Sequence, residues 1–334
     1  MDIETTGFSA ETCSIYLIGC AERRDDRLIL RQFFAETPDH EAEILAAFSD
    51  YIADKKAVIS FNGHRFDLPF LATRAKRHRL SLSLDDLASI DLYRIARKYK
   101  SLLQLSSCKQ KAIERALHID REDRCSGGEL IEVYRDYGRM GSQEGESLLA
   151  LHNHDDVFGM YPLLSLLSYE KLKEAHVVLT DLQSDGRDLL LTAELDLSLP
   201  IPARVRSAAL NMLMDQDLLR ALIPLRRASM RYELDHPENY YYLPEEDIVI
   251  PKALGESIAS SRRRRATPKI CCVKKDGVFF PLADFLPKPG DLPLFYETYR
   301  GRQAYLEYPD KREKEFMQRY LESILRSIEN YRWK

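Results

Sequence analysis

The chain has 334 residues, of which 45% are hydrophobic and 31% are charged, and its formal net charge is −4. This composition is typical of a globular protein with room for two domains, each with its own core. No apolar run reaches the roughly 18 residues of a membrane span, and no secretory signal is evident, so we expect a cytoplasmic protein without a membrane partner.

Charge and cysteine content narrow the function classes only slightly. A net charge of −4 does not indicate a nucleic-acid partner, although basic side chains can still gather on one face. The six cysteines show no C-x-x-C spacing, so they predict neither a zinc site nor a disulfide framework. Reduced thiols are the expected state in the cytoplasm.

The chain opens on the hexapeptide D-I-E-T-T-G at positions 2–7. Side chains alternate along a strand, so Asp2 and Glu4 project from the same face. Two carboxylates crowded in this way repel each other, and a hard cation such as Mg²⁺ or Mn²⁺ relieves the repulsion. The pair is a weak signal by itself, because such spacings arise by chance in a chain with 31% charged residues.

Two strands and a helix are predicted next. Residues 14–20 and 28–34 have the composition of strands, and a polar loop joins them. Asp39 is expected to cap a helix whose apolar residues recur at helical spacing. That apolar stripe consists of Ile44, Leu45, Phe48 and Ile52.

A second acidic motif follows a short apolar run at residues 57–61, which we interpret as a buried strand. Asn62 and Gly63 form the expected turn, and a helix is predicted from about residue 68 to 79. Asp67 then lies at the carboxyl end of the strand, where open α/β sheets place their ligands. For Asn62, a turn residue is favoured over a nucleotide contact.

Helices are predicted at residues 91–99, 109–117 and 128–137, the last one capped by Ser126. A longer helix follows and contains the sequence H-N-H-D-D-V at positions 152–157. His152 and Asp156 are four residues apart and share one face of that helix. His154 points about 200° away, so only one of the two histidines can face a metal site.

The pattern of short strand-like segments in the second half of the sequence predicts a small, mainly antiparallel β domain. Its expected strands are residues 176–182, 188–197, 210–214, 218–225 and 228–234. Lys275-Asp276-Gly277 is interpreted as a hairpin turn between strands at 270–273 and 278–280. A helix closes the chain from 311 to about 331.

Two surface segments of the second half are compatible with nucleic-acid binding. Residues 262–265 are four consecutive arginines, which suit either a phosphate clamp or a solvated helix end. Residues 240–242 are three tyrosines that could stack bases, although ordinary packing is favoured.

The motifs D-I-E-T-T-G, F-N-G-x-x-F-D-x-P-F-L and H-N-x-x-D-V together resemble those of the DEDD exonuclease superfamily. Its members include ribonuclease D and polymerase proofreading exonucleases. The segment 91–129 is similar to the bacterial YprB-like branch. The resemblance covers residues 1–172 and implies an α/β, ribonuclease H-like domain with a mixed sheet and flanking helices. Residues 173–334 would form the smaller β-rich accessory domain with its C-terminal helix.

The resemblance assigns roles residue by residue. It makes Asp2, Glu4, Asp67 and Asp156 the ligands of two divalent cations, Mg²⁺ or Mn²⁺, and places His152 beside the attacking water. The histidine class of the superfamily usually reads H-x4-D, whereas this chain has the H-x3-D spacing of the tyrosine class. The general-base role of His152 is therefore less firmly indicated than the four acids, and a core histidine is the alternative.

The start of the chain also departs from the superfamily pattern. In this fold several apolar residues precede the metal-binding acid on the first strand, whereas only Met1 precedes Asp2. We therefore expect that the first strand is truncated and that further strand residues lie upstream of Met1.

The expected activity is metal-dependent hydrolysis of phosphodiester bonds in DNA or RNA from a free 3′ end, by a two-metal mechanism. Additional substrate contacts are expected from Thr5 and Asn62, and from Arg262, Arg263, Arg264 and Arg265. The alternatives are a catalytically silent nucleic-acid-binding or scaffold protein on the same fold, and an endonuclease.

Overall fold

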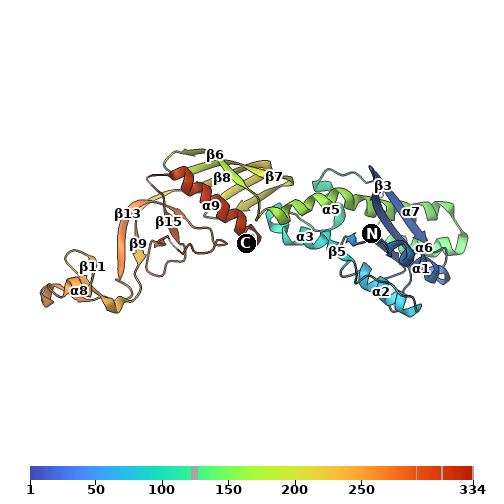
Figure 1. Cartoon of the computed structure of the whole chain (residues 1–334), viewed down its shortest axis with the longest axis horizontal. Helices are drawn as coiled ribbons and strands as arrows, with labels where there is room; N and C mark the ends of the chain where they lie inside the picture. Colours follow the sequence, from blue (N-terminus) through green and yellow to red (C-terminus); the bar gives the residue numbers. More distant parts are fainter. Residues whose placement is uncertain (122–126, 291, 310, 333–334) are drawn as a thin grey trace. The chain divides into compact units, whose positions relative to one another are not determined.

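The computed structural model describes residues 1–121, 127–290, 292–309 and 311–332. The chain folds into two compact units, Met1–Glu170 and Lys171–Lys334 (Figure 1). The first unit mixes strands with flanking helices, and the second is mainly β, as the sequence predicts. Within the described residues, every helix is too short or too polar to cross a lipid bilayer.

The first unit begins with a three-stranded antiparallel sheet. Its strands are β1 (Asp2–Thr5), β2 (Ile15–Arg24) and β3 (Arg27–Phe34), in that order. Asp2 pairs with Gly19 and Glu4 with Leu17, so both acids leave β1 on the same face. The run of buried residues at the start of β2 fixes this strand in the core, because both of its faces are covered.

Helix α1 (Glu41–Ile52) covers this sheet with the predicted apolar stripe. The expected cap at Asp39 is wrong. Asp39 lies inside a 3₁₀ turn (Pro38–His40), and His40 occupies the capping position without a side-chain hydrogen bond. The proline at the start of this turn fixes the local backbone and moves the beginning of the α-helix to Glu41.

A buried ion network joins three elements of this unit. Glu41 is fully buried, and its Oε1 accepts hydrogen bonds from the Ile15 amide and from Arg74 Nε, both at 2.8 Å. His78 Nε2 lies 2.7 Å from the other carboxylate oxygen. Burial acts to raise the pKa of Glu41, but these hydrogen bonds lower it overall. The charge is thus satisfied, as a buried carboxylate requires.

The parallel part of the fold is a pair of short strands. Strands β4 (Ala57–Ser60) and β5 (Ala88–Asp91) pair in parallel and are connected through helix α2 (Asp67–Arg77). The helix predicted at residues 91–99 begins only after β5. Asp91 ends that strand, and its carboxylate caps helix α3 by accepting from the Tyr93 amide at 3.0 Å. Asp91 therefore marks a strand-to-helix junction that the periodicity of the sequence does not reveal.

The remaining helices of this unit follow the predicted order, with the short helix α4 as an unpredicted addition. They are α3 (Leu92–Lys98), α4 (Lys100–Leu103), α5 (Gln110–Ala116), α6 (Gly127–Met140) and α7 (Gln143–Leu163). Helix α7 runs beside strands β1 to β3 and carries the third acidic motif across the sheet (Figure 1). The ring of Tyr134 on α6 stacks on Tyr16 at a centroid distance of 4.0 Å. The expected cap of α6, Ser126, lies outside the described residues.

The second unit contains a long-stranded sheet. Strands β6 (Val177–Ser184), β7 (Asp188–Arg206) and β8 (Asn211–Pro224) pair antiparallel in chain order, and helix α9 (Glu313–Ser327) crosses them (Figure 1). Strand β7 is much longer than the predicted 188–197. It continues through Pro200 and Pro202 because its register with β8 shifts there, as prolines within strands require. The two strands expected at 210–225 form the single strand β8.

Four further strands close a small barrel. They are β9 (Arg226–Glu233), β13 (Cys272–Pro281), β14 (Phe295–Tyr296) and β15 (Tyr305–Glu307). The hairpin expected at Lys275-Asp276-Gly277 is wrong, since β13 runs straight through it. Lys275 pairs with Met230 and Gly277 with Ala228, so continuous pairing with β9 overrides the local turn preference.

A third, smaller sheet contains the tyrosine and arginine segments. Its strands are β11 (Ile248–Pro251), β10 (Tyr240–Leu243) and β12 (Arg264–Arg265), and the short helix α8 (Lys252–Gly255) follows β11. The other 3₁₀ turns in the described part of the chain are Leu164–Lys171, Pro237–Asn239, Ser260–Arg262 and Ile328–Asn330.

Candidate active site

All four predicted acids line a single cleft of about 610 Å³ in the first unit, together with His152. They reach it from three elements. Strand β1 supplies Asp2 and Glu4, helix α2 supplies Asp67 at its first residue, and helix α7 supplies His152 and Asp156. The three sequence motifs, spread over more than 150 positions, thus meet at one place.

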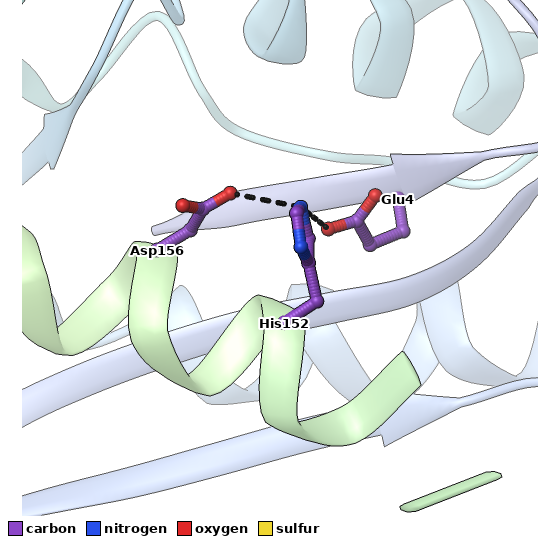
Figure 2. Close-up of side chains that lie close together, drawn as sticks. All are labelled: Glu4, His152 and Asp156. Carbon is purple, nitrogen blue, oxygen red and sulfur yellow. Dashed lines mark ion pairs between the residues drawn. The ribbon is translucent and has the colours of Figure 1, made fainter. Parts of the chain in front are cut away.

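The imidazole of His152 lies between two of the carboxylates (Figure 2). Its Nε2 is 3.3 Å from Asp156 Oδ2 and 3.6 Å from Glu4 Oε1. One ligand atom from each of these three residues lies within 4.8 Å of the other two. His152 is buried, so the ring is held in place facing the cleft.

Asp67, the first residue of α2, is held in place by a hydrogen bond from strand β1. Its Oδ1 accepts a hydrogen bond from the Ile3 amide on β1 at 3.1 Å. The turn before it depends on Asp91, whose carboxylate accepts from the Asn62 amide at 2.8 Å. Asn62 has a positive φ of 68°, which confirms the predicted turn, and it also lines the cleft.

Asp2 is oriented by a residue that the sequence analysis did not single out. Asn153 is fully buried, and its Nδ2 donates to Asp2 Oδ2 at 3.1 Å. Its Oδ1 accepts from Gln32 Nε2 at 3.1 Å, which fixes the orientation of the amide. Gly19 makes room for this group, because a Cβ at that position would lie 1.9 Å from Asn153 Oδ1. The sequence signal that could have identified Asn153 is its place as the asparagine of the H-N-x-x-D-V motif.

Crowding of the acids changes their proton affinities. Burial, followed by the charges of Asp156, Asp67 and Glu4, raises the pKa of Asp2 well above its ordinary range. Burial likewise raises the pKa of Asp67 to about 6, against hydrogen bonds from the backbone amides of Asp67 and Ile3 that lower it. Both acids therefore sit where a negative charge is unfavourable without a compensating positive charge.

Asp156 behaves differently, because two groups of the chain stabilise its charge. Burial acts to raise its pKa, but the hydrogen bond from His152 and the charge of Arg121 lower it overall. Arg121 Nη2 donates directly to Asp156 Oδ1. The other neighbour of this arginine is Glu114, whose Oε2 lies 3.4 Å from Nη1. Neither Arg121 nor Glu114 was anticipated, because no local spacing connects them to the acidic motifs.

The comparison with known protein families agrees with this geometry. The family RNase_H_2, described as RNase_H superfamily, matches residues 1–168. The chain belongs to the RNase H superfamily. No curated protein matches the chain. Membership identifies the first unit as a ribonuclease H-like domain and points to a nuclease-type hydrolase that acts on nucleic acid with the help of divalent metal ions.

The residues of this ribonuclease H-like cleft fit divalent cations. Glu4, His152 and Asp156 offer two oxygen ligands and one nitrogen ligand close together. Asp2, which is partly exposed, and the buried Asp67 add further carboxylates whose charge is otherwise unfavourable. Oxygen-rich sets of this kind suit Mg²⁺ and Mn²⁺.

The other predicted contacts of this RNase H superfamily member are dispersed. Thr5 does not line the described cleft, and its hydroxyl donates to the Gly7 carbonyl at 2.8 Å. Arg262 in the second unit pairs with Glu246 at 2.6 Å. Arg263 and Arg264 stack over tyrosines of β10, and Arg265 is exposed on β12.

His154 faces away from the acids, as the helical geometry predicts. Its Nδ1 lies 3.0 Å from Asp155 Oδ1, and its ring stacks on Phe158 at a centroid distance of 4.5 Å. Residues 152 and 154 therefore serve different faces of α7, and only His152 lines the described cleft.

Proposed function

We propose that the chain is a metal-dependent 3′–5′ exonuclease that hydrolyses phosphodiester bonds of DNA or RNA. The observation that carries this proposal is the convergence of four carboxylates and His152 on one cleft. The same cleft is also lined by Lys109, Lys111 and Arg121, so cationic side chains stand beside the acids. Acids that hold cations and bases that attract a polyanion are the two requirements of a nuclease.

The carboxylates of Asp2, Glu4, Asp67 and Asp156 would hold two divalent cations. When bound, the cations lower the pKa of a water molecule and stabilise the charge that develops on the scissile phosphate. The chain's contribution is to fix these carboxylates before the substrate arrives. Asn153 holds Asp2 and the Ile3 amide holds Asp67, so the site is largely organised in advance.

His152 is the proposed general base. Its Nε2 faces the cleft, and an imidazole has an unperturbed pKa near the operating pH. The ring accepts a proton at Nε2 from the attacking water while the water oxygen bonds to phosphorus, so in this step the neutral ring carries its own proton on Nδ1 and Nε2 does not donate to Asp156. The bond from phosphorus to the 3′ oxygen breaks, that oxygen takes a proton from solvent water, and the imidazolium returns its proton to solvent. The products are a nucleoside 5′-monophosphate and a strand shortened by one residue with a free 3′-hydroxyl.

The 3′–5′ direction is supported by the motif resemblance to DEDD exonucleases. The competing activities are endonucleolytic cleavage and nucleic-acid binding without catalysis. A digestion panel of single- and double-stranded DNA and RNA, labelled at either end, distinguishes cleavage from binding alone. A circular single strand in the panel distinguishes endonucleolytic from exonucleolytic cleavage, because it has no free end.

The decisive variants are Asp2→Asn and Asp67→Asn. We expect cleavage that requires Mn²⁺ or Mg²⁺ and is lost in both variants, with EDTA as the metal-free control. Asp54→Asn is the matched control, because it removes the same negative charge from an exposed residue just after α1, outside the cleft. Tight binding of nucleic acid without metal-dependent cleavage of any polymer would favour the silent binding module.

We also propose that the second unit helps to hold the substrate through its tyrosine and arginine sheet. Arg263 lies over the ring of Tyr241 at 4.5 Å and Arg264 over that of Tyr242 at 4.9 Å. Stacked rings and guanidinium groups suit an unpaired strand. Replacing all four arginines by glutamine should weaken binding and flatten its salt dependence, and an unchanged salt slope would remove this sheet from the interface.

A further inference from the structure

Arg121 is a buried cation placed directly against a proposed metal ligand. Its side chain is 9% exposed and lines the cleft, and its Nη2 donates to Asp156 Oδ1. Two other nitrogen atoms of the same guanidinium, Nε and Nη1, have no hydrogen-bond partner among the described residues. Among the described residues, the guanidinium therefore has hydrogen-bonding capacity beyond its bond to Asp156.

The surroundings of Arg121 hold its charge in the cleft. Glu114 is fully buried, and its Oε2 lies 3.4 Å from Arg121 Nη1. Gln110 Nε2 donates to Glu114 Oε1 at 2.9 Å and to the Asp156 carbonyl at 2.8 Å. Gly159 on α7 leaves space for this carboxylate, since a Cβ there would lie 2.2 Å from Glu114 Oε1.

Arg121 has an unused donor even while it holds Asp156. Its Nη2 can stay on Asp156 Oδ1 while Oδ2, which lies 3.3 Å from His152 Nε2, serves a cation. Arg121 Nε has no hydrogen-bond partner among the described residues, and leaving a charged donor unsatisfied in the cleft is costly. The substrate provides an anion at the same place, because its phosphate must approach the acids to be hydrolysed. Nε and Nη2 form one edge of the guanidinium, which matches two oxygens of a phosphate.

We propose that Arg121 is a phosphate-binding residue of the cleft, which pairs with Asp156 in the free protein and contacts a non-bridging oxygen of the substrate's phosphodiester. Glu114 is its positioning residue. This inference rests on the proposed function for the identity of the ligand, and it adds a second recognition element that acts on the nucleic-acid backbone rather than on the base.

The test compares a phosphorylated ligand with its unphosphorylated form. Calorimetry in the presence of Mn²⁺ measures the affinity for deoxyadenosine 5′-monophosphate and for deoxyadenosine. The first variant is Arg121→Gln. The second is the double variant E114Q/R121Q, which removes both charges and so avoids leaving Glu114 buried and unpaired. Thermal unfolding is followed for each protein.

We expect the double variant to lose about 10- to 100-fold in affinity for the monophosphate, the range of one charge-assisted hydrogen bond, and to bind deoxyadenosine like the wild type. Arg121→Lys should restore part of the loss, because lysine supplies the charge without the fork. Arg115→Gln is the matched control, since Arg115 is exposed on the same helix as Glu114 and does not line the described cleft.

The outcomes separate this inference from the proposed function. A phosphate preference that depends on Arg121 supports the phosphate site even if no polymer is cleaved. Metal-dependent cleavage combined with unchanged monophosphate affinity and unchanged KM in E114Q/R121Q would overturn the phosphate site and leave the exonuclease intact. Equal losses for both ligands would reduce Arg121 to a structural counter-ion and also overturn it.

Discussion

Asn153 holds Asp2 through a side-chain hydrogen bond of 3.1 Å from Nδ2 to Oδ2. The donor comes from the helix that carries His152 and Asp156, and the acceptor comes from the first strand. The relative position of two acidic motifs thus depends on a neutral amide between them. Outer groups of this kind fix the orientation of metal ligands.

Replacing Asn153 by Ala should therefore impair the site without removing an acid. We expect Mn²⁺ affinity and cleavage rate to fall by about 10- to 100-fold, because Asp2 loses its orienting donor. Titration with Mn²⁺ and single-turnover cleavage measure the two effects. Ser147→Ala, an exposed change on the same helix, is the control. Wild-type Mn²⁺ affinity in the Asn153 variant would contradict the orienting role.

Gly19→Ala should reproduce that defect from the opposite side of the contact. The new Cβ would lie 1.9 Å from Asn153 Oδ1, so the amide must move away from Asp2. Because both changes act on one contact, the double variant should be no worse than the more severe single variant. Gly138→Ala on α6 is the control, since a Cβ there meets no atom within 4 Å among the described residues. Additive losses would indicate two independent effects.

His152→Ala should lower the cleavage rate by about 10²- to 10⁴-fold if the imidazole is the general base. In that case the number of Mn²⁺ ions bound per chain stays unchanged. A role as metal ligand predicts instead that one ion is lost, because His152 Nε2 lies close to Glu4 and Asp156. His154→Ala, two residues away and outside the described cleft lining, should be active. A rate loss below about tenfold would leave His152 a structural role only.

The metal-free protein should become less stable as pH rises through the pKa of Asp67. This pKa is about 6 in the folded state, mainly through burial. An unfolded aspartate titrates near pH 4, so between about pH 4 and about pH 6 the folded state binds more protons than the unfolded state. The free energy of unfolding should therefore fall as pH rises, by roughly 3 kcal/mol in total from this group between well below pH 4 and well above pH 6.

Urea unfolding in EDTA at about pH 5 and about pH 7.5 captures roughly half of this change, because an unfolded aspartate is already mostly ionised at about pH 5. Asp67→Asn should remove the contribution of Asp67 to the pH dependence of the free energy of unfolding. The variant should also be more stable than the wild type at the higher pH in the absence of metal. Mn²⁺ should restore the stability of the wild type there, but not that of the variant to the same extent. An identical pH dependence in the wild type and in Asp67→Asn would show that Asp67 carries its charge without penalty.

The predictable part of the site is the part encoded by local periodicity. Strand alternation places Asp2 and Glu4 on one face, and helical spacing does the same for His152 and Asp156. The predicted strand-to-helix junction correctly locates Asp67. Each of these relationships spans a few residues, so a pattern in the sequence is enough to reveal it.

The unpredicted part depends on long-range contacts. Arg121 reaches Asp156 across 35 positions, and Asn153 reaches Asp2 across 151 positions. No periodicity connects such pairs. The same limit explains the wrong hairpin at Lys275-Asp276-Gly277, where pairing with a distant strand decides the conformation. Strand β5 was not predicted for a related reason, because its extended conformation depends on parallel pairing with the distant strand β4.

The hydrogen bond from the Ile3 amide to Asp67 has a use in spectroscopy. This amide belongs to β1 but donates to a side chain instead of a neighbouring strand, so its proton reports the occupation of a single carboxylate. If Asp67 binds a cation as proposed, its Oδ1 becomes a weaker acceptor for the Ile3 amide, and the resonance of that amide proton should shift. This single backbone resonance would therefore follow cation binding in the cleft in real time, without any need for substrate.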